Sequence, residues 1–206
     1  MNNGVISIGG SCLPRMTIKS TLNFTKKRGY KTCPFDLLFS TFKGACYNIK
    51  NDFSDFFDGL HIIQKCPDNC PVCRNSPFKN KGLISNNNGI IFEHESPTHA
   101  HFFGSNVGGD MMEWSKAKGD TEFFIRNNFE ELKQKYLIKI NNFRKKIKEN
   151  KRIILIRSKY PGENPPSEEE IKDLITGLEQ KYIGKKFIFF DIDSSKQSLS
   201  DVFNGI

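Results

Sequence analysis

The residue with the clearest chemical potential is Cys12, which follows two glycines and a serine at the end of a short apolar run. The β-branched residues Val5, Ile6 and Ile8 are typical of a buried strand, and Pro14 suits the first turn of a helix. The sequence therefore predicts Cys12 at a strand-to-helix turn. At a helix N-terminus the dipole lowers the pKa of a thiol, and the thiolate is a nucleophile. The alternative is a small cysteine packed beside a glycine turn.

A cysteine nucleophile needs a nearby base, usually histidine, and often a third group that orients the base. Among the four histidines, His94 is the best candidate because it follows the apolar run 90–92, which we expect to be a strand. His99 and His101 lie in a proline-containing loop and are alternatives. Candidates for the orienting acid, among which the sequence does not decide, are Asp36, Asp110, Asp191 and Asp193.

A second group of chemically active residues is formed by Cys66, Cys70 and Cys73, with the spacing C-x3-C-x2-C. Three thiolates this close suit a metal ion, and the last two resemble one knuckle of a zinc site. The candidates for a fourth ligand are His61, Cys46 and Cys33. The same spacing occurs in the iron–sulfur loop of radical S-adenosylmethionine enzymes, which we discount because no glycine-rich cofactor motif follows. A cysteine-rich loop without metal is the other alternative.

The charge of the chain is strongly positive, with 31 Lys and Arg and a formal net charge of +8 in 206 residues. It is concentrated at residues 26–28 and 133–152. The second cluster falls on a segment with helical apolar spacing, which favours an ordinary solvated helix face. Nucleic-acid binding also needs a recognition motif or aromatic residues beside the charge. We find neither, so we expect a peptide or protein substrate and no nucleic-acid partner.

The apolar stretches are too short for a membrane span, which takes ~18 residues or more. The N-terminus lacks the basic and apolar segments of a secretory signal. We therefore expect an intracellular, cytoplasmic protein without membrane contact (in the host cytoplasm if the chain is viral). In that compartment the six cysteines are thiols or metal ligands rather than disulfides.

The pattern of apolar residues predicts an α/β fold, with a mostly parallel central sheet flanked by helices in a single domain. Residues 1–193 form this domain, with a Cys-rich loop at 64–80, and residues 194–206 form a polar C-terminal tail. Strands are predicted over 5–8, 90–92, 152–157 and 187–192. Helices are predicted over 13–28, 35–50, 121–150 and 168–182, and a turn over 86–89.

Polar residues follow each of the four predicted strands. Functional sites of parallel sheets gather at the carboxyl ends of the strands, so we expect these side chains to converge. They are Cys12, His94, Arg157 with Ser158, and Asp191 with Asp193.

Several short motifs occur together in a recognisable order. They are ISIGGSC at 6–12, YKTCPFDLL at 30–38, FEHE at 92–95, a basic helix at 135–144 and the strand IILIR at 153–157. In this order they resemble the putative papain-like cysteine peptidase family, a domain of unknown function found in bacteria and large DNA viruses. That family combines SLG-x-x-C, PFDW, F-x-HDF, a Lys/Arg-rich helix and an FVR-like strand. The resemblance covers about residues 4–160.

The resemblance implies Cys12 as the nucleophile and His94 as the base. It makes Asp36 the aspartate of the PFD motif, in either an orienting or a structural role. Leu37 stands where the family has tryptophan, and Glu95 where it has aspartate. The family name also implies a papain-like α+β fold as the alternative to parallel α/β.

Three hypotheses about function follow. The first is a cysteine-dependent hydrolase or transferase acting on an acyl group, most simply a peptidase, which requires no cofactor. The second is a non-enzymatic viral or host interaction module with a zinc-stapled Cys-rich loop and a basic face. The third is a glycosyl- or nucleotide-handling enzyme that uses the Gly9-Gly10 turn as an anion site.

Overall fold

The structure, a computed structural model, describes residues 3–63, 83–96, 128–160 and 162–205. Its centre is a parallel sheet of β1 (Asn3–Ser7), β4 (Arg152–Arg157) and β5 (Lys186–Asp191). The strand order is β1-β4-β5, and Val5 pairs with Ile154, which pairs with Ile188. The prediction of a single α/β domain with a parallel central sheet is confirmed.

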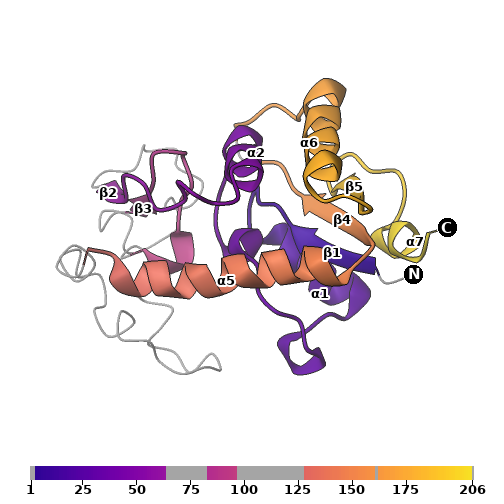
Figure 1. Cartoon of the computed structure of the whole chain (residues 1–206), viewed down its shortest axis with the longest axis horizontal. Coiled ribbons are helices and arrows are strands. Elements are labelled where there is room, and N and C mark those ends of the chain that lie inside the picture. Colours follow the sequence, from indigo (N-terminus) through magenta and orange to yellow (C-terminus); the bar gives the residue numbers. More distant parts are fainter. Residues whose placement is uncertain (1–2, 64–82, 97–127, 161, 206) are drawn as a thin grey trace.

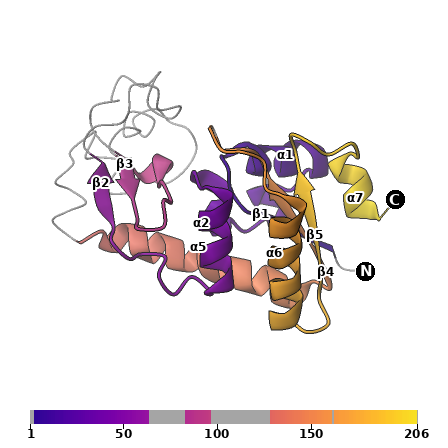
Figure 2. The same ribbon diagram turned by 90° about the horizontal axis from the view of Figure 1, so that it is seen from above.

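Helices cover both faces of the sheet (Figures 1 and 2). One face packs against α2 (Phe42–Lys50), α5 (Glu130–Glu149) and α6 (Glu168–Lys181). The other face packs against α1 (Leu13–Leu22) and α7 (Leu199–Asn204). Successive side chains of a strand point to opposite faces, so a strand covered on both sides must be apolar throughout. This explains the unbroken apolar run of β4.

The start of α6 follows from its local sequence. Ser167 Oγ accepts a hydrogen bond from the Glu170 N–H at 3.2 Å, and the Glu170 carboxylate accepts one from the Ser167 N–H at 2.8 Å. This reciprocal capping satisfies N–H groups that have no partner inside the helix. Leu174 and Leu178 then bury the inner face of α6. The predicted helix over 168–182 is confirmed to within one residue at its end.

Three other predicted helices differ from those observed. The first ends at Leu22, and the basic residues after it form a separate 3-10 helix, η1 (Lys26–Arg28). The second is divided into a 3-10 helix, η2 (Pro34–Leu37), and α2, because Leu38 between them is extended. Within the described residues, the long basic helix begins only at Glu130.

The prediction that residues 90–92 form a strand of the main sheet is wrong. Ile91 makes only isolated antiparallel bridges, to Phe39 and to Ser85. Nearby, β2 (His61–Ile63) pairs antiparallel with β3 (Leu83–Ser85). The predicted turn before this run is confirmed, since the Asn86 side-chain oxygen accepts from the N–H groups of residues 88 and 90. That turn folds the run back onto β3 and away from β4.

The segment expected to be a polar tail contains α7. Leu199 and Val202 of this helix are buried against the same face of the sheet as α1. The Ser198 hydroxyl caps α7 by accepting from the Asp201 N–H at 3.1 Å. In the part of the chain that the structure describes, no helix is long and apolar enough to cross a bilayer.

A short 3-10 helix, η3 (Glu93–Glu95), is anchored on α5 by charge and by aromatic packing. The buried Glu95 carboxylate lies 2.5 Å from Lys135 Nζ and 3.5 Å from Lys139 Nζ, and it accepts a hydrogen bond from the Tyr136 hydroxyl at 3.1 Å. The Phe92 ring packs edge-on against Tyr136, with centroids 4.9 Å apart. Burial opposes ionisation of Glu95, but the two lysines outweigh it and lower its pKa to about 2.

We expect Glu95→Gln to lower the free energy of unfolding at pH 7 by about 3–5 kcal/mol, because it leaves the buried Lys139 without its carboxylate. The pKa of Glu95 is depressed, so its stabilisation is full above about 4.5 and is lost as the pH falls toward 2. Urea denaturation at several pH values measures this. The difference in free energy of unfolding between wild type and variant should become smaller as the pH falls from about 4.5 toward 2.

The matched control is Glu169→Gln, an exposed carboxylate on α6. Its cost should stay below about 1 kcal/mol. Equal losses in the two variants would contradict the anchoring role of Glu95.

Candidate active site

The turn after β1 is closed by two glycines with left-handed backbone angles, φ 94° at Gly9 and 85° at Gly10. A Cβ on Gly10 would lie 1.7 Å from the Ser158 carbonyl oxygen, and one on Gly9 would lie 2.0 Å from Ser40 Oγ. The Gly9 and Gly10 N–H groups donate to the hydroxyls of Ser7 and Ser40, at 3.5 and 3.4 Å. Both N–H groups are therefore already hydrogen-bonded inside the protein, which argues against the use of this turn as an anion site.

Arg157, the last residue of β4, lies next to this turn. Its side chain is only 2% exposed. Its guanidinium donates to the Ile8 carbonyl at 3.1 Å, the Ser40 carbonyl at 3.0 Å and the Glu163 carboxylate at 2.6 Å. The second oxygen of Glu163 accepts from the Phe42 N–H at 2.5 Å. One buried cation thus joins the end of β1 to the start of α2 and to the loop that follows β4.

Cys12 occupies the predicted place, at the N-cap of α1 directly after the glycine turn. The neighbouring Ser11 fixes this corner, because its hydroxyl lies 3.1 Å from the Ser158 hydroxyl and accepts from the Leu13 N–H at 3.1 Å. The Cys12 thiol is partly exposed.

The pKa of the Cys12 thiol is raised, contrary to the expected lowering. Burial raises the pKa of Cys12, and the Glu93 carboxylate raises it further, whereas the backbone N–H of Cys12 opposes both. A negative charge and partial desolvation both disfavour a thiolate.

His94 lies on η3, half-buried, between Glu93 and the anchored Glu95. The charge of His94 contributes to the low pKa of Glu95, and the charge of Glu93 reaches the Cys12 thiol. The turn that carries His94 is therefore within electrostatic range of the Cys12 thiol through Glu93. The contacts of η3 with α5, and not a strand of the parallel sheet, hold this turn in place.

Asp36 is fully buried in η2. Both of its carboxylate oxygens lie 3.1 Å from the Tyr30 hydroxyl, and one accepts from the Cys33 N–H at 2.8 Å. Burial raises the pKa of Asp36, and the Cys33 N–H and the charge of Lys146 oppose that effect. These contacts favour the structural one of the two roles expected for Asp36.

The other candidate acids hold the loop after β5. The Asp193 carboxylate accepts from the Lys159 N–H at 2.6 Å, and the Asp191 carboxylate from the Ser194 hydroxyl at 2.9 Å. With Arg157, they line a cleft of about 250 Å³. The predicted residues at the ends of β4 and β5 therefore share one cleft, but neither Cys12 nor His94 lines it. The candidates Asp110, His99 and His101 lie outside the described residues.

The expected zinc ligands Cys66, Cys70 and Cys73 also lie outside the described residues, so a zinc site there stays a prediction. Of the possible fourth ligands, His61 is exposed, with Nδ1 2.8 Å from the Gly59 carbonyl oxygen. Cys33 is buried and Cys46 half-buried. Within the described part of the chain, no group of three or more His, Cys, Asp and Glu side chains is placed to hold a metal ion.

Sequence reasoning missed four residues that build this region: Tyr30, Ser40, Glu93 and Glu163. A partial signal existed for Glu163, because an arginine that ends a buried strand needs an acidic partner close by. The roles of the other three depend on contacts between segments distant in sequence, for which the chain carries no local signal.

A family model described as putative papain-like cysteine peptidase, a domain of unknown function, matches residues 3–191. This match spans the glycine turn, Asp36, His94 and the strands β1, β4 and β5. No curated protein and no solved structure matches the chain.

We expect Gly10→Ala to lower the free energy of unfolding by at least ~3 kcal/mol, because the left-handed angle is unfavourable and the new Cβ meets the Ser158 backbone. Gly184→Ala is the matched control, since Gly184 has φ 77° but open space around it. It should cost only about 1–2 kcal/mol. Urea denaturation compares the two, and equal costs would show that the approach to Ser158 is not tight.

We expect Glu93→Gln to lower the pKa of Cys12 by removing the negative charge that raises it. Iodoacetamide should then modify Cys12 faster at pH 8, whereas the plateau rate at high pH stays unchanged. Peptide mass spectrometry measures the rate at each pH. Glu169→Gln should leave the profile as in wild type, and a profile unmoved by Glu93→Gln would contradict the electrostatic contact.

Proposed function

Because the chain belongs to the putative papain-like cysteine peptidase family, we propose that it is a cysteine-dependent hydrolase of acyl substrates, most simply a peptidase. Cys12 is the nucleophile and His94 the base in this proposal. The observation that supports it best is the position of Cys12 at the first turn of α1, within electrostatic reach of the turn that carries His94.

The proposed reaction follows from these two groups. His94 takes the proton of the Cys12 thiol, and the sulfur attacks the carbonyl carbon of the substrate. Backbone N–H groups at the start of α1 stabilise the oxyanion. The protonated imidazole gives its proton to the leaving amine as the C–N bond breaks and a thioester remains. Water, deprotonated by His94, then attacks the thioester and releases the acid and the free thiol.

The raised pKa of Cys12 makes a base necessary. At neutral pH a thiol with a raised pKa is almost entirely protonated, and it is then a poor nucleophile. A protonated imidazole beside the sulfur would offset the negative charge of Glu93. In this proposal η3 therefore supplies both the Glu93 carboxylate, which raises the pKa of the thiol, and the His94 imidazole, which counteracts that effect.

A peptide substrate would meet an apolar surface next to the thiol. Leu13 and Met16, on the first turns of α1, are 41% and 59% exposed. They follow Cys12 by one and four positions, which places Met16 on the same side of the helix. This surface suits an apolar side chain close to the scissile bond.

The test is the pH dependence of alkylation of Cys12 in wild type and His94→Ala. For a Cys–His pair we expect Cys12 to react already at pH 6–7, where thiols are otherwise slow. His94→Ala should abolish the alkylation at pH 6–7, so that the alkylation rate rises in a single step at high pH. Cys46, whose burial raises its pKa to about 12, is the internal control and should react slowly in both proteins.

Hydrolysis supplies the second readout. In a fluorogenic peptide library, Cys12→Ser and His94→Ala should each reduce the rate by roughly 10²–10⁴-fold. Asp36→Asn should mainly reduce stability. A wild-type alkylation profile that is indifferent to His94, or cleavage that survives Cys12→Ser, would show that the proposed pair is wrong.

A further inference from the structure

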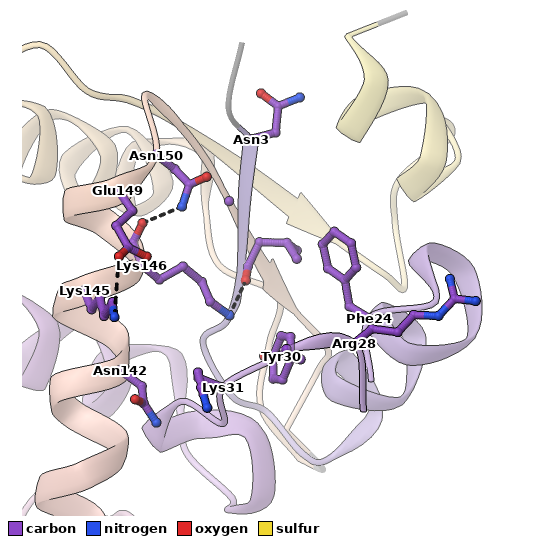
Figure 3. Close-up of a pocket in the computed structure, with 13 residues that line it drawn as sticks. Asn3, Phe24, Arg28, Tyr30, Lys31, Asn142, Lys145, Lys146, Glu149 and Asn150 are labelled. Atoms are coloured by element: carbon purple, nitrogen blue, oxygen red, sulfur yellow. Dashed lines mark hydrogen bonds and ion pairs between the residues drawn. The ribbon is translucent and has the colours of Figure 1, made fainter. Parts of the chain in front are cut away.

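A second cleft lies at the other end of β1, between the outer edge of that strand, the C-terminal half of α5 and the segment 24–31 (Figure 3). Its volume is about 350 Å³, within the range of small-molecule sites. Asn3, Gly4 and Val5 of β1 line it, whereas Cys12 follows the opposite end of the strand. The cleft is therefore separate from the candidate active site.

Four cationic side chains line this cleft, against a single carboxylate. They are Arg28, Lys31, Lys145 and Lys146, with Glu149 as the acid. They come from two basic clusters more than 100 residues apart in the sequence, which the fold brings to the same cleft. In Figure 3 the Arg28 side chain extends outward from the cleft, away from the lysines of α5. A cleft lined mainly by one sign of charge raises the local concentration of ions of opposite sign, so this cleft would attract an anion.

The floor of the cleft is fixed by contacts inside the protein. The Lys146 ammonium donates to the Val5 carbonyl at 3.2 Å and lies 3.8 Å from the centroid of the Tyr30 ring. Asn142 donates to the Thr32 carbonyl at 3.0 Å. Lys146 thus covers the edge of β1, which disfavours the addition of an extended peptide as a further strand.

The rim is different, because its cations are exposed. Arg28, Lys31 and Lys145 are all exposed, and Lys145 lies 3.6 Å from Glu149 in an exposed ion pair. Such a pair contributes little and exchanges easily. The exposed cations of the rim can therefore bind a ligand without breaking contacts that stabilise the fold.

We propose that this cleft binds a small phosphate-bearing anion with at least two negative charges. Arginine forks and lysine ammonium groups together suit phosphate oxygens. The Arg15 guanidinium and the Lys146 ammonium each lie 3.8 Å from the centroid of the Tyr30 ring, so the ring is not open for stacking on a base. Recognition then rests on the phosphate groups and not on a nucleobase, and a volume of about 350 Å³ suits a small molecule.

Calorimetric titration of the full chain with pyrophosphate, and separately with inorganic phosphate, at low ionic strength tests the proposal. We expect saturable binding, tighter for pyrophosphate. Arg28→Gln and Lys145→Gln should each weaken it roughly three- to tenfold, as expected for the loss of one charged contact. Glu149→Gln should tighten binding, because it removes the carboxylate that competes for Lys145.

Lys148→Gln is the matched control, since Lys148 lies on the same helix, is exposed and does not line the cleft. It makes the same change of charge and should leave the affinity unchanged. Cys12→Ala should also leave it unchanged, which keeps this result independent of the proposed hydrolase.

Three results would overturn the proposal. The first is no saturable binding of pyrophosphate in the millimolar range. The second is an equal loss in Lys148→Gln, which would show that only net charge matters. The third is tighter binding of a short RNA or DNA duplex that Lys148→Gln also weakens, which would make this face a nucleic-acid surface.

Discussion

The buried guanidinium of Arg157 is the contact on which the carboxyl edge of the sheet depends. A charge taken out of water must be paired and hydrogen-bonded. Arg157 meets this need by donating to two carbonyl groups and to the Glu163 carboxylate, which come from three separate segments. Burial lowers the pKa of Arg157, and the Glu163 charge opposes this. The position of the glycine turn, and hence of Cys12, therefore depends on a charge pair between β4 and its following loop.

Two further buried acids connect other short segments in a similar way. Glu95 fastens η3 to α5 through Lys135, Lys139 and Tyr136, as its ion pairs and hydrogen bond show. Asp36 closes η2 through Tyr30 and the Cys33 N–H. These residues belong to the short motifs by which the sequence resembles its family. Glu95 joins its motif to the basic helix, whereas the partners of Asp36 lie within the same motif, at 30–38.

The sequence was most informative where structure depends on neighbouring residues. The apolar run of β4, the helix that begins at residue 168 and the turn before residue 90 are all local, and each was predicted correctly. Residues 90–92 were misassigned because three apolar residues do not distinguish a sheet strand from a segment that forms bridges alone. The effect of Glu93 on Cys12 and the role of Asp36 were not predictable, because both depend on which segments the fold brings together.

The local charge at Cys12 also shows why the net charge of +8 does not decide the chemistry of the site. Buried cations are already paired with acids, Arg157 with Glu163 and two lysines of α5 with Glu95. The thiol consequently senses the carboxylate of Glu93 in spite of the basic composition. The exposed lysines and arginine of the second cleft gather at the far end of β1, where salt screens them. Within the proposed pair, the positive charge available to the thiol is therefore the one that His94 gains when it is protonated.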